Sequence, residues 1–209
     1  MQTKQDLQIL LSDLMGNIQG TIQYNNEHNG VANVTDICAI MTRTEDEGTD
    51  TSGSAAYKNF VALSAEYRVA NGQECEDASW EDTVTGWLAP IAKDPLNAGR
   101  PWTFQTCNEF GYFQTTDSKH QPFHAWNILN LDFYMEMCAA GFDGWSAYPQ
   151  VGFMDVTYGG VDIDVTNVLF AAGTIDPWHA LGRLCLLCVH YICVYVYTIY
   201  VCVYYICMC

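Results

Sequence analysis

The sequence predicts an α/β fold in which a mostly helical region is followed by one late strand. Three stretches, 7–24, 55–70 and 125–140, carry apolar residues at helical spacing, which predicts amphipathic helices. The run 165–172 is instead short, apolar and rich in β-branched residues, and it stops at Gly173. These features predict a buried strand that ends at a tight turn.

The helical region is divided by polar, turn-rich loops. A short helix is expected after the first loop, with Thr35 as its N-cap. The second long helix is expected to end at Asn71-Gly72, which is a C-terminal cap signal. The stretch 100–117 is predicted to be an extended segment before the last helix. Within it two sets of residues alternate with a period of two: Trp102, Phe104 and Thr106 on one face, and Thr103, Gln105 and Cys107 on the other.

Asp176 follows the predicted strand and is itself followed by Pro177. A proline disfavours helical backbone angles for the preceding residue, so the carboxylate is expected at a fixed position just past the strand. Open α/β sheets place their chemistry at this end of their strands. A fixed aspartate there suits the acid of a Ser-Asp-His triad, which orients an imidazole and stabilises its protonated form. An Asp-Pro turn that only closes an ordinary strand fits the same pattern.

Three motifs together resemble one family of serine peptidases. They are LMGNIQGTIQY (14–24), RPWTFQTCNEFGYFQTTD (100–117) and GTIDPWHALG (173–182). The family contains lysosomal Pro-X carboxypeptidase, dipeptidyl peptidase II and thymus-specific serine protease, and the resemblance covers residues 5–182. It implies an α/β-hydrolase fold, of which this chain is a C-terminal fragment.

Under this resemblance the chain has three regions. They are a helical cap, or insertion, over 1–160, a late strand of the hydrolase core over 161–182, and an anomalous tail over 183–209. The triad of such enzymes follows the chain order Ser, Asp, His. Asp176 is therefore the expected triad acid, with the nucleophile before Met1 and the histidine shortly after Gly182.

The other two members of the triad are not found in the sequence. No G-x-S-x-G motif occurs among the 209 residues. His179 belongs to the family motif itself and His190 lies in the tail, so neither is expected to be the general base. We therefore expect an inactive part of a serine exopeptidase. The alternative is a non-catalytic derivative that binds peptides through the cap, or a membrane-tethered adaptor.

The resemblance implies acyl-enzyme hydrolysis of peptides with proline near one terminus, without a metal or an organic cofactor. Cleavage by a carboxypeptidase and by a dipeptidyl peptidase both remain open. The resemblance places Glu109 near the substrate cleft, where it could pair with a free peptide amine, although a solvated or structural Glu109 fits too. Trp178 is a candidate for the wall of the substrate pocket or for an ordinary core aromatic.

The formal net charge of −16 at pH 7 argues against a nucleic-acid partner and against an anionic membrane surface, since both require a basic face. The first residues lack a basic stretch followed by an apolar run, so no signal peptide is expected in this chain. The resemblance implies that the parent protein is lysosomal or secreted. No oligomeric state is predicted.

Four of the ten cysteines are dispersed through the body of the chain, which suits disulfides in an oxidising compartment, although buried free thiols fit too. The resemblance favours a disulfide between Cys107 and Cys138. It also suggests that Cys38 and Cys75 pair with cysteines further upstream. Asn33 begins an Asn-Val-Thr glycosylation sequon, which is consistent with the same compartment.

The tail over 184–209 has no Lys, Arg, Asp or Glu and consists mostly of Cys, Val, Tyr, Ile and Leu. It is long and apolar enough for a transmembrane span, but its tyrosines are spread throughout and no basic anchor follows. We expect read-through of repetitive noncoding DNA, with a genuine membrane anchor as the alternative. Membrane contact is expected only in the second case.

Two further residue pairs have spacings found at metal sites. His120 and His124 have the i, i+4 spacing of a zinc pair, but Pro122 breaks the helix that would align their rings. Cys185 and Cys188 resemble half of a zinc or redox motif, and no second half follows. No metal site is therefore expected.

Overall fold

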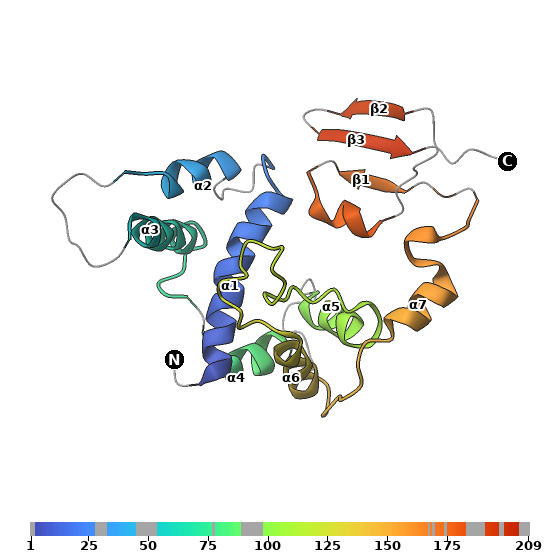
Figure 1. The fold of residues 1–209 in the computed structure, drawn as a ribbon, viewed down its shortest axis with the longest axis horizontal. Coiled ribbons are helices and arrows are strands. Elements are labelled where there is room, and N and C mark those ends of the chain that lie inside the picture. Colours follow the sequence, from blue (N-terminus) through green and yellow to red (C-terminus); the bar gives the residue numbers. More distant parts are fainter. Residues whose placement is uncertain are drawn as a thin grey trace. The chain divides into compact units, whose positions relative to one another are not determined.

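The computed structural model describes residues 3–27, 33–44, 54–76, 78–88, 98–166, 168, 170–173, 175–182, 191–196 and 199–204. Figure 1 labels the helices and strands along the chain. The chain divides into two compact units. Unit 1 comprises Met1–Ser12 with Asp77–Val165, and unit 2 comprises Asp13–Glu76 with Thr166–Cys209. Helix α1 (Lys4–Gln23) contributes its first residues to unit 1 and the remainder to unit 2.

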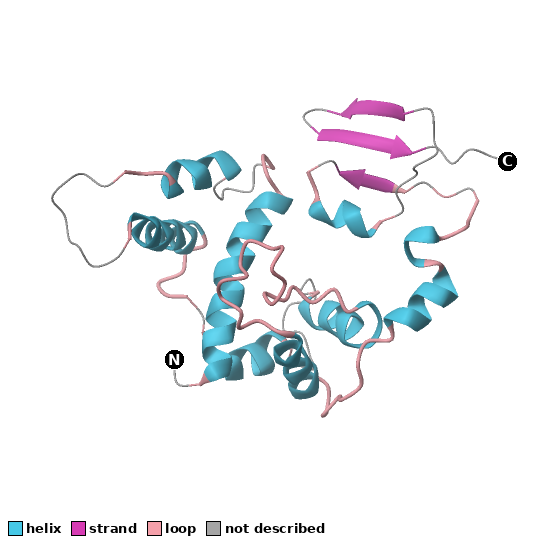
Figure 2. Ribbon diagram, viewed as in Figure 1, coloured by secondary structure: helices cyan, strands magenta, loops and turns pink. Residues whose placement is uncertain are grey.

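Beyond the start of α1, the described residues of unit 1 form short helices and loops (Figure 2). In chain order they are α4 (Trp80–Asp82), the π-helix η1 (Thr83–Trp87), α5 (Gly99–Gln105), the π-helix η2 (Thr106–Phe110), α6 (Leu131–Gly141), α7 (Val151–Tyr158) and the 3-10 helix η3 (Gly160–Asp162). Each of these helices is too short to be stable in isolation, so packing against its neighbours must maintain it.

A buried threonine, Thr116, joins the segment after η2 to the segment before α6. Its backbone N–H donates to the carbonyl oxygen of Leu129 at 2.6 Å. Its hydroxyl oxygen accepts the N–H groups of Ile128 at 3.2 Å and Leu129 at 3.1 Å. The side chains of Leu129 and Phe133 are at most 1% exposed. The polar groups of this part of the core are thus satisfied by the backbone, as burial requires.

Residues 99–110 are helical, so the prediction of an extended segment over 100–117 is wrong for its first part. Period-two alternation favours a strand only weakly, and packing overrides it here. The ring of Phe104 meets that of Phe142 edge-on, with ring centroids 5.3 Å apart. Pro101 is compatible with the helix because a residue in the first helical turn has no intrahelical N–H bond to lose.

Helix α6 starts at Leu131, whereas the sequence predicts a helix over 125–140. Its N-cap is Asn130, whose side-chain oxygen accepts the N–H of Phe133 at 3.1 Å. The two residues before the cap donate their N–H groups to the Thr116 hydroxyl instead. Because these two N–H groups are hydrogen-bonded to the Thr116 side chain, they do not form helical hydrogen bonds, and the helix begins after them.

Unit 2 contains the second part of α1 together with α2 (Val34–Met41) and α3 (Ala55–Ala70). The first and second long helices predicted from the sequence are confirmed. Helix α3 ends at Asn71, and Gly72 has a φ of 67°, a left-handed conformation that favours glycine. This is the C-terminal cap predicted from the Asn-Gly pair.

The core of unit 2 joins all three of these helices. Ile40, Leu63 and Tyr67 are buried, and Ile18 of α1 packs against them. The hydroxyl of Tyr67 shares a buried hydrogen bond with the hydroxyl of Thr21. Burial raises the pKa of Tyr67, and the hydrogen bond to Thr21 offsets part of that effect.

The N-cap of α2 is Asn33, two residues before the predicted Thr35. The Asn33 side-chain oxygen accepts the N–H of Asp36 at 3.1 Å, and the Asp36 carboxylate accepts the N–H of Asn33 at 2.9 Å. This reciprocal pair is a capping box. The asparagine of the glycosylation sequon therefore also has a structural role.

Replacing Asn33 with alanine is expected to lower the free energy of unfolding by about 1 kcal/mol, because the cap loses its side-chain acceptor. Asn33→Ser is the matched control, since serine also caps helices while removing the sequon. Denaturant titration of unglycosylated protein measures both variants. The capping role would be contradicted if Asn33→Ala were as stable as Asn33→Ser.

Unit 2 also contains a three-stranded antiparallel sheet with the strand order β1-β3-β2. The strands are β1 (Ala171–Gly173), β2 (Tyr191–Val196) and β3 (Ile199–Tyr204). Ala171 lies opposite Val203, and Tyr191 lies opposite Tyr204. The strand predicted over 165–172 is therefore shorter and begins later, because only the last part of that run pairs with β3.

The tail supplies β2 and β3, which are rich in the β-branched and aromatic residues that favour strands. Residues 183–190, 197–198 and 205–209 lie outside the described ranges, and with them the tail cysteines of the Cys-x-x-Cys pair. No helix within the described ranges is long and apolar enough to cross a membrane. The origin of the tail in read-through stays a prediction, as do the boundaries of the three expected regions.

Candidate active site

A sharp turn after β1 holds Asp176. The turn begins at Gly173, where a Cβ atom would lie 3.4 Å from the Cβ of Asp176. Asp176 has φ −73° and ψ 114°, an extended conformation that suits the residue before a proline. It is the N-cap of the 3-10 helix η4 (Pro177–Leu181), and its carboxylate is half-buried.

The carboxylate of Asp176 is oriented by the backbone that follows it. Its Oδ1 atom accepts the N–H of Trp178 at 3.0 Å. An ionised carboxylate has acceptor sites on both oxygens, so this bond leaves capacity for a further donor. A half-buried carboxylate with one oxygen fixed by the backbone can accept the N–H of an imidazole, which is what a triad acid does.

His179 belongs to the same turn but does not face the Asp176 carboxylate. Its backbone N–H donates to the carbonyl oxygen of Asp176 at 3.1 Å, and its ring Nδ1 contacts the same oxygen. The ring is therefore held against the backbone of the turn. The other histidine considered as a base, His190, lies outside the described residues.

Trp178 links this turn to α1 within unit 2. Its indole Nε1 donates to the side-chain oxygen of Gln23 at 3.0 Å, across a sequence separation of 155 residues. Both side chains are half-buried. Sequence reasoning missed Gln23, because no local pattern relates residues so far apart. The one available signal was that Gln23 lies in the first of the three family motifs.

A disulfide joins Cys107 of η2 to Cys138 of α6, with their Cα atoms 5.8 Å apart. Both cysteines are buried. Glu109 lies two residues further along η2 and is half-buried. Glu109 and the disulfide belong to unit 1, whereas Asp176 and Trp178 belong to unit 2.

The other cysteines and histidines singled out from the sequence lie apart from this turn in the chain. Cys38 and Cys75 are exposed free thiols, and a pairing with upstream cysteines stays a prediction for both. His120 is exposed and His124 is half-buried in the turns before α6. Within the part of the chain that the structure describes, no group of three His, Cys, Asp or Glu residues is arranged to hold a metal ion.

Tyr134 of α6 has the most strongly raised pKa among the described groups. Its hydroxyl donates to the carbonyl oxygen of Gln114 at 2.9 Å. Its ring stacks on that of Phe113, with centroids 5.0 Å apart, and meets that of Phe133 edge-on at 5.1 Å. Burial raises the pKa of Tyr134 to about 12 from its ordinary value of 10.0, because the apolar surroundings disfavour the phenolate.

The raised pKa of Tyr134 predicts a loss of stability at alkaline pH. The folded protein keeps the phenol proton up to about pH 12, whereas the unfolded chain releases it near 10.0. The folded state therefore binds more protons in this window, so stability is complete below pH 10 and falls as the pH rises. Denaturant unfolding between pH 8 and 11 should show a shallower alkaline decline in Tyr134→Phe. The control is the same change at Tyr148, which is 63% exposed. Equal declines in wild type and Tyr134→Phe would contradict the effect.

Comparison with known proteins identifies the family. The chain matches the family model described as Serine carboxypeptidase S28 over residues 1–198. The chain belongs to this family. Membership confirms the resemblance seen in the three sequence motifs. The family implies an α/β-hydrolase fold, and the mostly helical structure is consistent with a fragment of one.

The matches to individual relatives cover less than half of each relative's own length. The chain is 29% identical to thymus-specific serine protease of Mus musculus over 175 residues, which are 82% of this chain and 33% of that protein. It is 28% identical to lysosomal Pro-X carboxypeptidase of Bos taurus over 126 residues, which are 59% of this chain and 22% of that protein. The chain thus spans a third or less of the length of these two relatives. No solved structure matches the chain.

Proposed function

We propose that the chain is the C-terminal part of a serine exopeptidase and that Asp176 is the acid of its catalytic triad. The observation that carries the proposal is the geometry of the turn after β1. Pro177 and the N–H of Trp178 fix the carboxylate, and the hydrogen bond to Trp178 occupies only one of its oxygens. Membership of the serine carboxypeptidase family supports the same chemistry.

In this mechanism Asp176 accepts a hydrogen bond from Nδ1–H of the triad histidine. That bond selects the tautomer whose Nε2 can take the proton of the serine hydroxyl, and the negative charge stabilises the imidazolium that results. The serine oxygen attacks the scissile carbonyl carbon, the peptide C–N bond breaks, and the amine leaves with the proton that the imidazolium returns. The histidine then takes a proton from water, which attacks the acyl ester. This releases the carboxylic acid product, and the proton passes back to the serine oxygen. The chain order Ser, Asp, His places the serine upstream of Met1 and the histidine downstream of Gly182 in the complete enzyme.

The proposed substrates are peptides with proline near one terminus, a preference suggested by the name of the lysosomal Pro-X carboxypeptidase relative. Trp178 is proposed as an apolar wall of the substrate site. Glu109 is proposed to bind the free amine of the peptide, which applies if the enzyme is a dipeptidyl peptidase.

The parent protein is proposed to be lysosomal or secreted. A disulfide such as Cys107–Cys138 persists in an oxidising compartment. The relative named for the lysosome supports the same location. Asn33 is the proposed glycosylation site, and its sequon threonine, Thr35, is exposed.

The isolated 209-residue chain is expected to hydrolyse no peptide, because its sequence holds no G-x-S-x-G nucleophile. The assay uses peptides with proline as the penultimate residue from either end, together with labelling by a fluorophosphonate. Complete lysosomal Pro-X carboxypeptidase of cattle serves as the active control. Hydrolysis by the isolated chain that the fluorophosphonate abolishes would overturn this part of the proposal.

A second candidate is a non-catalytic derivative that binds peptides through its helical region. The same candidate includes a membrane-tethered form, in which the tail over 184–209 acts as an anchor. A transcript that encodes a serine elbow upstream of Met1 would exclude this candidate.

A further inference from the structure

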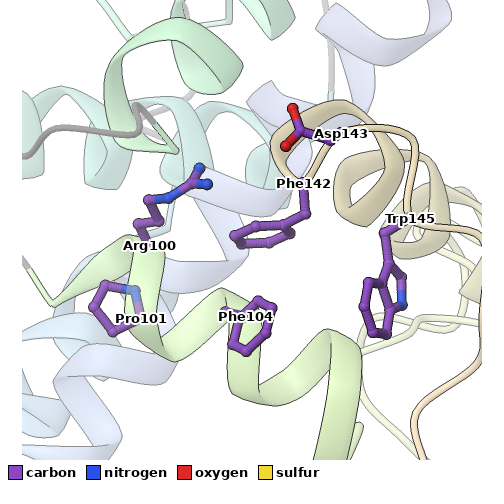
Figure 3. Close-up of a pocket in the computed structure, with 6 residues that line it drawn as sticks. All are labelled: Arg100, Pro101, Phe104, Phe142, Asp143 and Trp145. Atoms are coloured by element: carbon purple, nitrogen blue, oxygen red, sulfur yellow. The ribbon is translucent and has the colours of Figure 1, made fainter.

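Unit 1 contains a pocket of about 410 Å³ between α5 and the turn that follows α6 (Figure 3). Its lining comprises Arg100, Pro101 and Phe104 from α5, and Phe142, Asp143 and Trp145 from the turn. The volume falls in the lower part of the range of small-molecule sites, roughly 300–1,000 Å³. Three aromatic rings, one cation and one carboxylate therefore surround a space that fits a small molecule.

The apolar part of the pocket is built around Phe104. Its ring lies edge-on to Phe142 at 5.3 Å and edge-on to Trp145 at 6.2 Å. The indole Nε1 of Trp145 donates to the carbonyl oxygen of Ala147 at 2.9 Å, which fixes that ring. Phe104 is nevertheless 42% exposed. A ligand ring can therefore pack against Phe104 and Trp145 without displacing either side chain.

The cation of the pocket is held rigidly. The guanidinium carbon of Arg100 lies 4.6 Å from the centre of the Phe142 ring. Its Nη1 atom donates to the carbonyl oxygens of Gly141, at 2.8 Å, and Leu88. These bonds use one of the three guanidinium nitrogens, and the other two carry three further N–H donors. Arg100 thus presents a positioned positive charge, which suits a carboxylate.

The carboxylate of the pocket belongs to Asp143, which is exposed and has a φ of 52°. In Figure 3, Arg100 and Asp143 lie toward one side of the pocket, and the rings of Phe104 and Trp145 lie toward the other. Opposite charges at one side and rings at the other match the layout of a free amino acid. Such a molecule carries an ammonium group and a carboxylate on one carbon, with the side chain extending from it.

We propose that this pocket binds a free α-amino acid with an apolar ring as its side chain. The ligand carboxylate pairs with Arg100, the ammonium group pairs with Asp143, and the ring packs against the exposed faces of Phe104 and Trp145. The pocket lies wholly in unit 1, so the inference does not rest on the proposed role of Asp176. The two are linked chemically, because a carboxypeptidase releases one free amino acid for each bond that it cuts.

The experiment is a chemical-shift titration of the 209-residue chain with three related probes. L-Phenylalanine carries both charges, N-acetyl-L-phenylalanine lacks the ammonium group and stands for the last residue of a peptide, and L-phenylalaninamide lacks the carboxylate. L-Phenylalanine is expected to bind roughly 2- to 5-fold more tightly than either derivative, which is the usual effect of an exposed ion pair. Equal or tighter binding of N-acetyl-L-phenylalanine would assign the pocket to peptide ends and overturn the proposal, as would absence of binding by all three.

Asp143→Asn tests the ammonium contact without disturbing the backbone, since asparagine tolerates a positive φ as aspartate does. The variant is expected to weaken L-phenylalanine roughly 2- to 5-fold and to leave N-acetyl-L-phenylalanine unaffected. Asp117→Asn is the matched control, because Asp117 is also exposed and lies outside the pocket. An unchanged affinity of Asp143→Asn for L-phenylalanine would refute the contact.

Phe104→Ala tests the ring contact and is expected to weaken all three probes roughly tenfold. Trp102→Ala is its control, because Trp102 lies on the same helix, is also 42% exposed and does not line the pocket. If both variants weakened binding equally, the probes would be bound at another place and the proposal would fail.

Discussion

Replacing Asp176 with asparagine in the complete enzyme is expected to lower kcat by about 10⁴-fold and to leave the fold intact. Asparagine keeps a side-chain oxygen that can accept the N–H of Trp178, so the cap of η4 survives. The variant loses the negative charge that stabilises the imidazolium and selects the tautomer of the triad histidine. Turnover of a proline peptide and thermal unfolding, measured on the same preparation, separate the two effects.

Asp164→Asn is the matched control for this experiment. Asp164 is exposed, carries the same charge and lies before the turn that holds the proposed triad acid. Its replacement is expected to leave kcat unchanged. A kcat for Asp176→Asn equal to that of the control would contradict the triad role and would leave Asp176 as a structural cap.

Removing the disulfide between Cys107 and Cys138 is expected to lower the free energy of unfolding by about 3–4 kcal/mol. The bridge spans a sequence separation of 31 residues, so its loss restores much conformational entropy to the unfolded chain. Both side chains are at most 1% exposed, so alanine at these positions also leaves unfilled space in the core. Denaturant unfolding of the Cys107→Ala/Cys138→Ala double variant measures the loss.

Cys38 and Cys75 provide the control for this measurement. Both are exposed free thiols, so their replacement by alanine is expected to change the free energy of unfolding by less than about 0.5 kcal/mol. If the two double variants were equally stable, the disulfide would contribute nothing to the fold. The link between η2 and α6 would then need another explanation.

Local signals predicted the helices of unit 2 well. The long amphipathic helices α1 and α3 follow from their apolar spacing, and the end of α3 follows from the Asn71-Gly72 pair. Such features depend on residues a few positions apart, which a sequence displays directly. The extended backbone conformation of Asp176 could also be predicted from an adjacent residue, because Pro177 restricts it.

The misplaced elements depend on distant contacts. Residues 99–110 alternate like a strand, yet the packing of Phe104 against the turn after α6 makes them helical. The start of α6 is set by Thr116, which takes the N–H groups of the residues that the helix would need. The extent of β1 is likewise set by its partner, β3, and not by its own apolar run. None of these partners is adjacent in the chain.

The candidate site likewise contains residues that a local motif reveals and residues that only distant contacts reveal. The sequence singles out Asp176 and Trp178 as candidates because a short motif carries both. Gln23, which binds the Trp178 indole, is separated from it by 155 residues. The pocket beside Phe104 was missed because its wall was predicted to be extended. In an extended segment Arg100 and Phe104 would lie about 13 Å apart along the chain, whereas the helix brings them to within about 6 Å along its axis, where both line the pocket.

The most direct test of the central claim is the sequence of the full-length transcript, extended in both directions past the codons for Met1 and Gly182. The account predicts a G-x-S-x-G motif upstream and a histidine within a few tens of residues downstream of Gly182, in the chain order of an α/β-hydrolase triad. Asp176 would then occupy the acid position of a complete serine exopeptidase. A transcript that begins at Met1 and ends after Cys209 would contradict the catalytic account and would support the non-catalytic derivative.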